Sequence, residues 1–207
     1  MENERFERSR MLLIVDPQID FINGTLPVPG AEKAMDDLAK YLEEHGKVYQ
    51  HIFVTCDRHP IDHISFKRFG GPWPPHCVTA SVGGAIWPPL MDYFLEHVPQ
   101  IIILFKGENS DEDEYSIFAS ESGRNDIAEY FLEVGSAIEI DVCGLAGDVC
   151  VATTLEDALR LFPDHIYKVL LEYTASLDGG EKIRKLAEDM ERRNARLWPG
   201  EFWGDSR

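Results

Sequence analysis

The sequence lacks basic residues relative to acidic ones. Its 207 residues include 20 Lys and Arg against 37 Asp and Glu, a formal charge of −17. Binding to nucleic acid or to an anionic membrane needs a positively charged face, so this balance disfavours both partners. No run of 18 apolar residues is present to span a bilayer. The first ten residues are charged and lack the apolar core of a secretory signal, so we expect a cytoplasmic location.

Cysteine is also scarce, with four residues and no CxxC pair: Cys56, Cys77, Cys143 and Cys150. In a cytoplasmic protein we expect them to be reduced thiols, each of which could simply be a small buried side chain. A chain of this length can bury a sufficient core without disulfides. The composition is that of a globular protein, and the length predicts a single domain over residues 1–207 with short N- and C-terminal tails.

Predicted strands and helices alternate along the chain. Apolar or β-rich runs predict strands at residues 11–15, 48–55, 101–105, 137–143 and 166–171, and a short one around 195–198. Helices are predicted at residues 31–46, 88–97, 124–134, 148–161 and 180–194, and a long loop at 56–85. This alternation implies a parallel sheet covered on both faces. We therefore predict a three-layer α/β/α sandwich with a mostly parallel, six-stranded sheet.

Reactive side chains follow four of the predicted strands. Asp16 follows the first, Asp57 the second and Lys106 the third, and Cys150 stands at a predicted helix start after the fourth. In sheets of this kind, ligands bind beyond the carboxyl ends of the strands. A cysteine needs a base or a nearby positive charge to become a thiolate, which Asp16 and Lys106 can supply. Each residue alone fits an ordinary turn, but together they predict acyl transfer through a thioester.

The turn before Cys150 has the sequence GLAGDV, at residues 144–149. Small residues there let the backbone approach a substrate and present N–H groups to an oxyanion, at about 3 kcal/mol per donor. A glycine-rich strand-to-helix turn without any ligand is the alternative.

A second group of residues has the spacing of a metal site. Asp57 and His59 project to the same side of an extended segment, and His63 and His76 lie further along the same loop. One Asp and two His suit Zn²⁺, Mn²⁺ or Fe²⁺ with open coordination sites. The alternative is a chance spacing of ordinary surface histidines.

Five short motifs then follow one another in a fixed order within residues 11–176. They are DPQIDF at 16–21, TCDRHP at 55–60, WPPHCV at 73–78, KG at 106–107 with DEYSIF at 113–118, and GLAGDVCV at 144–151. Together they resemble the nicotinamidase/pyrazinamidase family of isochorismatase-like cysteine hydrolases. Any one motif is a weak signal, but the joint order is specific.

The resemblance implies roles for the residues at the strand ends. Cys150 corresponds to the nucleophile, Asp16 to the general base and then acid, and Lys106 to their electrostatic partner. In this family a non-proline cis peptide precedes the residue that matches Ala146. The implied oxyanion hole consists of the backbone N–H groups of Ala146 and Cys150.

The resemblance also implies a cofactor and a ring-binding pocket. One divalent metal ion, zinc or alternatively manganese or iron, is expected on Asp57, His59 and His76. His63 is a candidate fourth ligand. The aromatic walls that hold a flat ring are expected to be Phe21, Trp73 and Tyr115, for which simple core packing is the alternative.

The implied reaction is hydrolysis of nicotinamide to nicotinate and ammonia, a step of NAD salvage, with a small molecule as the binding partner. The alternatives are a related amidohydrolase that acts on a carbamoyl or ureido group, and a non-catalytic relative that binds a ligand. Two features depart from the family pattern: Arg58 stands where an aromatic residue often lies, and the acidic stretch 108–114 makes the cleft rim negative. A negative rim disfavours anionic substrates such as isochorismate. Family members include monomers and homo-oligomers, so the oligomeric state stays open.

Overall fold

A computed structural model of the chain describes residues 9–134 and 138–197. Its centre is a parallel sheet with the strand order β3-β2-β1-β4-β5. The strands are β1 (Arg10–Val15), β2 (His51–Asp57), β3 (Ile101–Lys106), β4 (Glu139–Gly144) and β5 (Ile166–Thr174). In the central strand, Leu13 lies opposite Phe53 of β2 and Val142 of β4. The parallel arrangement predicted from the alternating elements is therefore confirmed.

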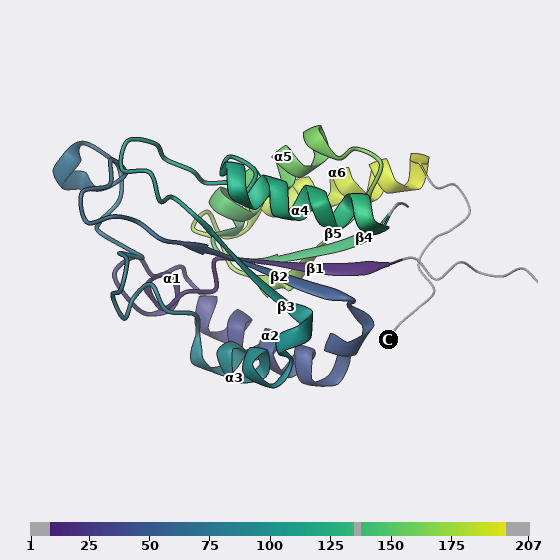
Figure 1. Cartoon of the computed structure of the whole chain (residues 1–207). Coiled ribbons are helices and arrows are strands. Elements are labelled where there is room, and N and C mark those ends of the chain that lie inside the picture. The colour runs from purple at the N-terminus through teal and green to yellow at the C-terminus, as the bar shows by residue number, and fades with distance from the viewer. Residues whose placement is uncertain (1–8, 135–137, 198–207) are drawn as a thin grey trace, which may run out of the picture.

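Helices cover both faces of the sheet, as Figure 1 shows. One face packs against α2 (Ala31–His45) and α3 (Pro88–Glu96), and the other against α4 (Glu121–Val134), α5 (Ala152–Leu161) and α6 (Glu181–Leu197). Successive residues of a strand point to opposite faces, so Leu12 and Ile14 of β1 join the first core. Met11, Leu13 and Val15 join the second core. The predicted three-layer sandwich is confirmed.

The sixth predicted strand is not confirmed, because the sheet has five strands within the described residues. Residues 195–197, which belong to the expected strand at 195–198, continue α6 up to Leu197. Ala, Arg and Leu are strong helix formers, so this extension agrees with their local preference. Residue 198 and the predicted terminal tails lie outside the described residues.

Two long connections meet at the carboxyl end of the sheet, at the left of Figure 1. The segment 58–87 follows β2 and contains a 3₁₀ turn at Lys67–Phe69, and the segment 107–120 follows β3. The backbone N–H of Ile64 donates to the carbonyl of Ser110 at 2.8 Å and ties the two segments together. A short helix, α1 (Ile19–Ile22), follows β1 at the same end. This end of the sheet therefore carries the loops that can shape a site.

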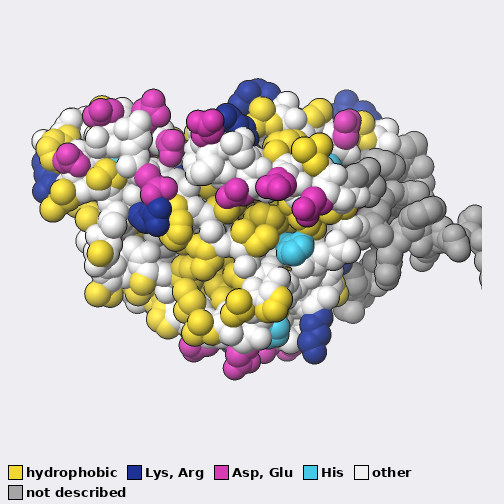
Figure 2. All heavy atoms as spheres, in the orientation of Figure 1, with side chains coloured by type: hydrophobic (Ala, Val, Ile, Leu, Met, Phe, Trp, Pro, Cys, Tyr) yellow, Lys and Arg dark blue, Asp and Glu magenta, His cyan; other side chains and the backbone are white. Residues whose placement is uncertain are grey.

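On the face shown in Figure 2, hydrophobic side chains gather near the middle and acidic side chains lie around them. β3 forms one edge of the sheet, and its Ile103 is 37% exposed.

None of the described helices combines the length and the apolar character needed to cross a membrane.

Gly144, the first residue of the predicted nucleophile turn, has no room for a side chain. Its φ is +121°, and a Cβ atom there would lie 2.1 Å from the carbonyl oxygen of Val15. We expect Gly144→Ala to lower the free energy of unfolding by about 3 kcal/mol or more, since steric overlap adds to backbone strain. Urea denaturation measures this change.

The matched control is Gly70→Ala. Gly70 also has a positive φ, +97°, but no atom lies within 4 Å of the position of its Cβ. Only the backbone strain of about 1–2 kcal/mol is expected there. Equal losses in the two variants would contradict the steric explanation.

Candidate active site

The ammonium group of Lys106 is the centre of the candidate site. Lys106 ends β3, is fully buried, and lies 2.8 Å from Oδ2 of Asp16, which directly follows β1. It also forms an ion pair with Oδ1 of Asp57, the last residue of β2, and donates to Sγ of Cys150 at 3.7 Å. The structure thus brings together the three residues that the sequence marked for thioester chemistry, from separate strand ends. The ion pair between Lys106 and Asp57 also connects a predicted metal ligand to these three residues.

Burial and charge set the protonation of this group. Burial lowers the pKa of Lys106, but Asp16 and Asp57 outweigh it and hold the pKa well above its usual value. Burial raises the pKa of Asp16 above its ordinary value, with Lys106 opposing and Asp57 adding to the rise. Burial also raises the pKa of the Cys150 thiol, again with Lys106 opposing. The site therefore holds a permanent ammonium, a thiol that needs a base, and a carboxylate made more basic by its surroundings.

Asp16 is held in one orientation by Thr55, a residue that the sequence analysis did not single out. The Thr55 hydroxyl donates to Oδ1 of Asp16 at 2.7 Å, and the Asp16 N–H donates to the Thr55 carbonyl at 3.0 Å. Asp16 itself has a φ of +48°, a conformation that non-glycine residues rarely adopt outside functional sites. These contacts leave Oδ2 facing Lys106 and the thiol.

Asp57, His59 and His76 form a buried group whose donor atoms all lie within 4.8 Å of one another. Oδ2 of Asp57 is 3.5 Å from Nε2 of His59 and 4.0 Å from Nε2 of His76. The Nδ1–H of His59 donates to the Gly107 carbonyl, and that of His76 donates to the Pro74 carbonyl, each at 2.8 Å. Because these bonds fix the proton on Nδ1, both Nε2 lone pairs are free to bind a metal. The group fits a divalent ion.

Protonation of this group follows from its partners. Burial raises the pKa of Asp57, but Lys106 and His59 outweigh it and hold the pKa below its ordinary value. Burial lowers the pKa of His76, whereas Asp57 outweighs burial at His59 and raises its pKa, so a metal bound there would displace the proton from His59. An ionised carboxylate and a neutral imidazole are the forms that bind metal.

His63 lies beside this group without joining it. Its Nε2–H donates to the carbonyl of Glu112 at 2.9 Å, and its Nδ1 accepts from the Ser65 hydroxyl at 2.7 Å. The ring stacks on that of His59, with centroids 4.0 Å apart. Both ring nitrogens of His63 therefore have partners outside the metal-binding group. His63 packs against His59, and its bond to Glu112 links the two long connections.

Gln18 and Asp20 position the metal-binding group from within the motif DPQIDF. The Gln18 side-chain amide donates to the Asp57 carbonyl and accepts from the Asp57 N–H, both at 2.8 Å. Asp20 accepts from the N–H of Cys77, next to His76, at 2.7 Å. The sequence analysis missed both roles, although two polar residues inside a buried strand-end motif were the available signal. The backbones of both ligand segments are therefore fixed from the end of β1.

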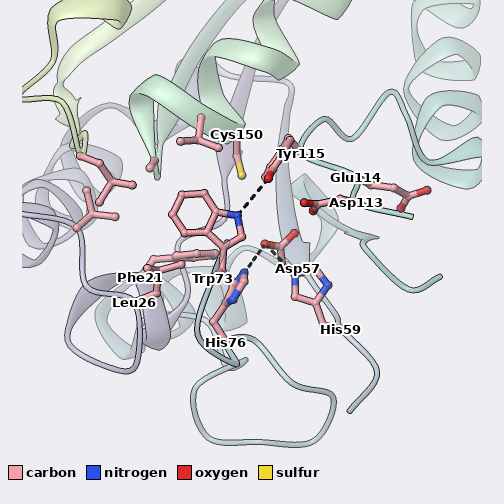
Figure 3. A pocket seen from close by; sticks show the side chains of 14 residues that line it. Phe21, Leu26, Asp57, His59, Trp73, His76, Asp113, Glu114, Tyr115 and Cys150 are labelled. Carbon is pink, nitrogen blue, oxygen red and sulfur yellow. Dashed lines mark hydrogen bonds and ion pairs between the residues drawn. The ribbon is translucent and has the colours of Figure 1, made fainter. Parts of the chain in front are cut away.

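A pocket opens over the thiol and the metal-binding group, shown from close by in Figure 3. Its volume, counted to the open mouth, is about 420 Å³. The three predicted aromatic walls all line it: Phe21, Trp73 and Tyr115. Nε1 of Trp73 donates to the Tyr115 hydroxyl at 3.1 Å, which joins two walls across the pocket. The lining also contains six residues that were not predicted as binding residues: Leu26, Val28, Asp113, Glu114, Val149 and Leu177.

Arg58, which stands where the family often has an aromatic residue, lies outside this pocket. Its guanidinium group pairs with Glu108 and lies 3.9 Å from the centroid of the Phe105 ring. It is absent from the lining of the pocket within the described residues.

The nucleophile turn places Cys150 in a π-helical turn, Gly147–Val151, immediately before α5. The Leu145–Ala146 peptide is cis, as the family resemblance implied. Ala146 and Cys150 both line the pocket, and within the described residues no acceptor receives the N–H of Ala146. Asp148 accepts the N–H of Leu177 at 2.9 Å, which ties a pocket wall after β5 to the same turn.

Comparisons with known proteins agree with this geometry. No protein-family model matches the chain. A nicotinamidase/pyrazinamidase of Mycobacterium tuberculosis is 33% identical over 183 residues, which cover 86% of this chain and 93% of that protein. The chain belongs to the nicotinamidase/pyrazinamidase family. The family predicted from the five motifs is thereby confirmed.

Solved structures of nicotinamidases and pyrazinamidases share the fold. The pyrazinamidase of Pyrococcus horikoshii in complex with zinc superposes with a TM-score of 0.70 at 29% identity and covers 89% of this chain and 96% of its own. The yeast nicotinamidase Pnc1p bound to the inhibitor nicotinaldehyde has a TM-score of 0.76 at 28% identity and covers 89% and 97%. The likeness therefore extends over nearly the whole of both relatives.

Proposed function

We propose that this chain is a metal-dependent nicotinamidase that converts nicotinamide and water to nicotinate and ammonia. The observation that carries the proposal is that Cys150, which lines an aromatic pocket beside a buried metal-binding group, meets Asp16 and Lys106. A thiol, a base and a cation are the parts that thioester chemistry requires, and the aromatic walls suit a flat ring. Relatives named for the same activity support the choice of substrate.

The first half of the reaction forms the thioester. Asp16 accepts the proton of the Cys150 thiol, and Lys106 stabilises the thiolate that results. Sulfur attacks the carboxamide carbon, and the N–H groups of Ala146 and Cys150 donate to the oxygen that becomes negative. Asp16 then returns the proton to the departing nitrogen, and ammonia leaves. General acid–base catalysis of this kind contributes about 10²–10⁴ in rate.

The second half releases the acid. Asp16, again ionised, takes a proton from a water molecule that attacks the thioester carbon, and the same N–H groups stabilise the oxyanion. The C–S bond breaks, and the sulfur regains a proton as nicotinate leaves. Lys106 keeps its charge throughout, since two carboxylates hold its pKa far above neutrality.

The cofactor that we infer is a single zinc ion on Asp57, His59 and His76, and a relative has been solved with zinc. When bound, the ion supplies a Lewis-acid contact for the pyridine nitrogen, which orients the ring. The roles of the three aromatic walls belong to the same proposal. The predicted cytoplasmic location remains a prediction.

The proposal is tested by ammonia release from a substrate panel, before and after chelation. We expect release from nicotinamide and pyrazinamide, loss of activity when the metal is removed, and recovery on addition of Zn²⁺. Elemental analysis should show about one metal ion per chain, which Asp57→Ala removes. Metal-loaded, folded protein that releases no ammonia from nicotinamide would contradict the assignment.

The panel also separates the two alternative functions. Release from carbamoyl or ureido compounds, with none from nicotinamide, would indicate the related amidohydrolase. Binding of nicotinamide without hydrolysis of any compound would indicate a non-catalytic relative. The intact set of Cys150, Asp16 and Lys106 favours an enzyme over a non-catalytic relative, because binding alone does not need all three residues.

A further inference from the structure

Asp113 is a carboxylate at the pocket that the proposed reaction does not use. It belongs to the acidic stretch 108–114, which follows β3, and it lines the pocket. Figure 3 shows its carboxylate directed towards Tyr115 and Asp57, whereas that of its neighbour Glu114 points away. Glu114 instead accepts the N–H of Gly107 at 2.7 Å. Within the described residues, no ion pair neutralises Asp113, and Arg58 pairs with Glu108.

The charge of Asp113 reaches into the ring-binding space. Burial raises the pKa of Tyr115 to about 12, and the negative charge of Asp113 acts in the same direction. Tyr115 in turn accepts from Trp73, and Figure 3 shows the Asp113 carboxylate next to Tyr115. A ligand between these walls therefore lies close to an uncompensated negative charge.

The charges around the pocket show how Asp113 could affect the binding of an anion. Asp16, Asp57 and Lys106 together carry one negative charge, which a bound divalent ion would turn into one positive charge. Such a pocket would attract a carboxylate. The charge of Asp113, whose carboxylate faces the pocket while that of Glu114 points away, offsets this positive charge and weakens the attraction, while a neutral amide is little affected.

We propose that Asp113 is a specificity-determining residue that disfavours bound carboxylates, so that the neutral amide binds and the carboxylate product is released. This inference rests on the proposed function, in which a neutral substrate becomes an anion inside the pocket. Asp113 would then act on the inhibition constant of the product rather than on the chemical step.

The experiment measures inhibition by nicotinate in the metal-loaded protein at low ionic strength. We expect Asp113→Asn to lower the Ki of nicotinate by about fivefold, the effect of one partly screened charge. The KM for nicotinamide should change by a smaller factor. Asparagine has nearly the same size and shape as aspartate, so the substitution removes the charge and keeps the volume of the side chain. Asp113→Glu restores the charge and should restore the wild-type Ki.

The matched control is Asp111→Asn, which removes the same charge from the same exposed stretch at a residue outside the pocket lining. Its Ki should stay near that of the wild type. Raising the salt concentration should bring the Ki values of the wild type and Asp113→Asn together, because salt screens the charge by which the two proteins differ. A purely structural role of Asp113 would not produce this convergence.

Two results would overturn the inference: an unchanged Ki in Asp113→Asn, or parallel changes in Ki and KM. Direct calorimetric binding of nicotinate and nicotinamide to Cys150→Ala, with and without Asp113→Asn, makes the same comparison without turnover. Because this comparison does not need turnover, absence of ammonia release from the wild type would overturn the proposed function and leave this inference intact. Equal nicotinate affinity with and without the Asp113 charge would overturn this inference alone.

Discussion

Ammonia release from nicotinamide is expected to fall to background, by at least about 10³-fold, when Cys150 is replaced by Ala. Without the sulfur no thioester can form, and the remaining groups can only polarise the amide and position water. The side chain is small and buried, so the loss of packing should cost about 1 kcal/mol and leave the protein folded. A coupled ammonia assay measures the activity, and circular dichroism on heating verifies the fold.

Cys143→Ala is the matched control for this variant. Cys143 is an equally buried thiol, but it lies within β4 and outside the pocket lining. We expect it to retain most of the activity. Substantial ammonia release by Cys150→Ala, or an equal loss in Cys143→Ala, would remove Cys150 from its proposed role.

Replacing Lys106 by Met should cause the largest loss of stability among the site variants. The substitution leaves the carboxyl groups of Asp16 and Asp57 buried without their shared ammonium. Removing one partner of a buried ion pair costs about 3–5 kcal/mol. Urea denaturation of the metal-free protein should show this loss of unfolding free energy, and activity should disappear with it.

A surface lysine gives the comparison for this result. Lys182 lies 3.5 Å from Glu156, with both side chains about half exposed. Lys182→Met should change the free energy of unfolding by less than about 1 kcal/mol. If Lys106→Met were equally mild, the two carboxyl groups would not depend on the ammonium as the structure implies.

Much of this site could be predicted because strand ends are readable in a sequence. Asp16, Asp57 and Lys106 each stand at the end of an apolar run, and parallel strands bring such positions to one edge. The small residues of the nucleophile turn and the spacing of the metal ligands left alternatives open, and the resemblance to the family assigned both. These signals are local, and the regular geometry of the sheet converts them into proximity.

The supporting contacts could not be predicted in the same way. Thr55 and Gln18 act through side-chain hydrogen bonds between neighbouring strands, and their partners depend on the register of the sheet. Leu177 enters the pocket from beyond β5 and is held by Asp148, across 29 positions of sequence. The missing sixth strand has a different cause: residues 195–197 fit a helix or a strand, and α6 extends over them.

The shared ammonium of Lys106 links two parts of the site that are usually treated as independent modules. The same ammonium group pairs with the carboxylate that moves protons and with the carboxylate that would hold the metal. A substitution of Asp57 that favours a different ion would therefore alter the basicity of Asp16. A change in the basicity of Asp16 would likewise alter the affinity for the metal. Redesign of ring selectivity in this protein thus has to treat both carboxylates as one adjustable unit.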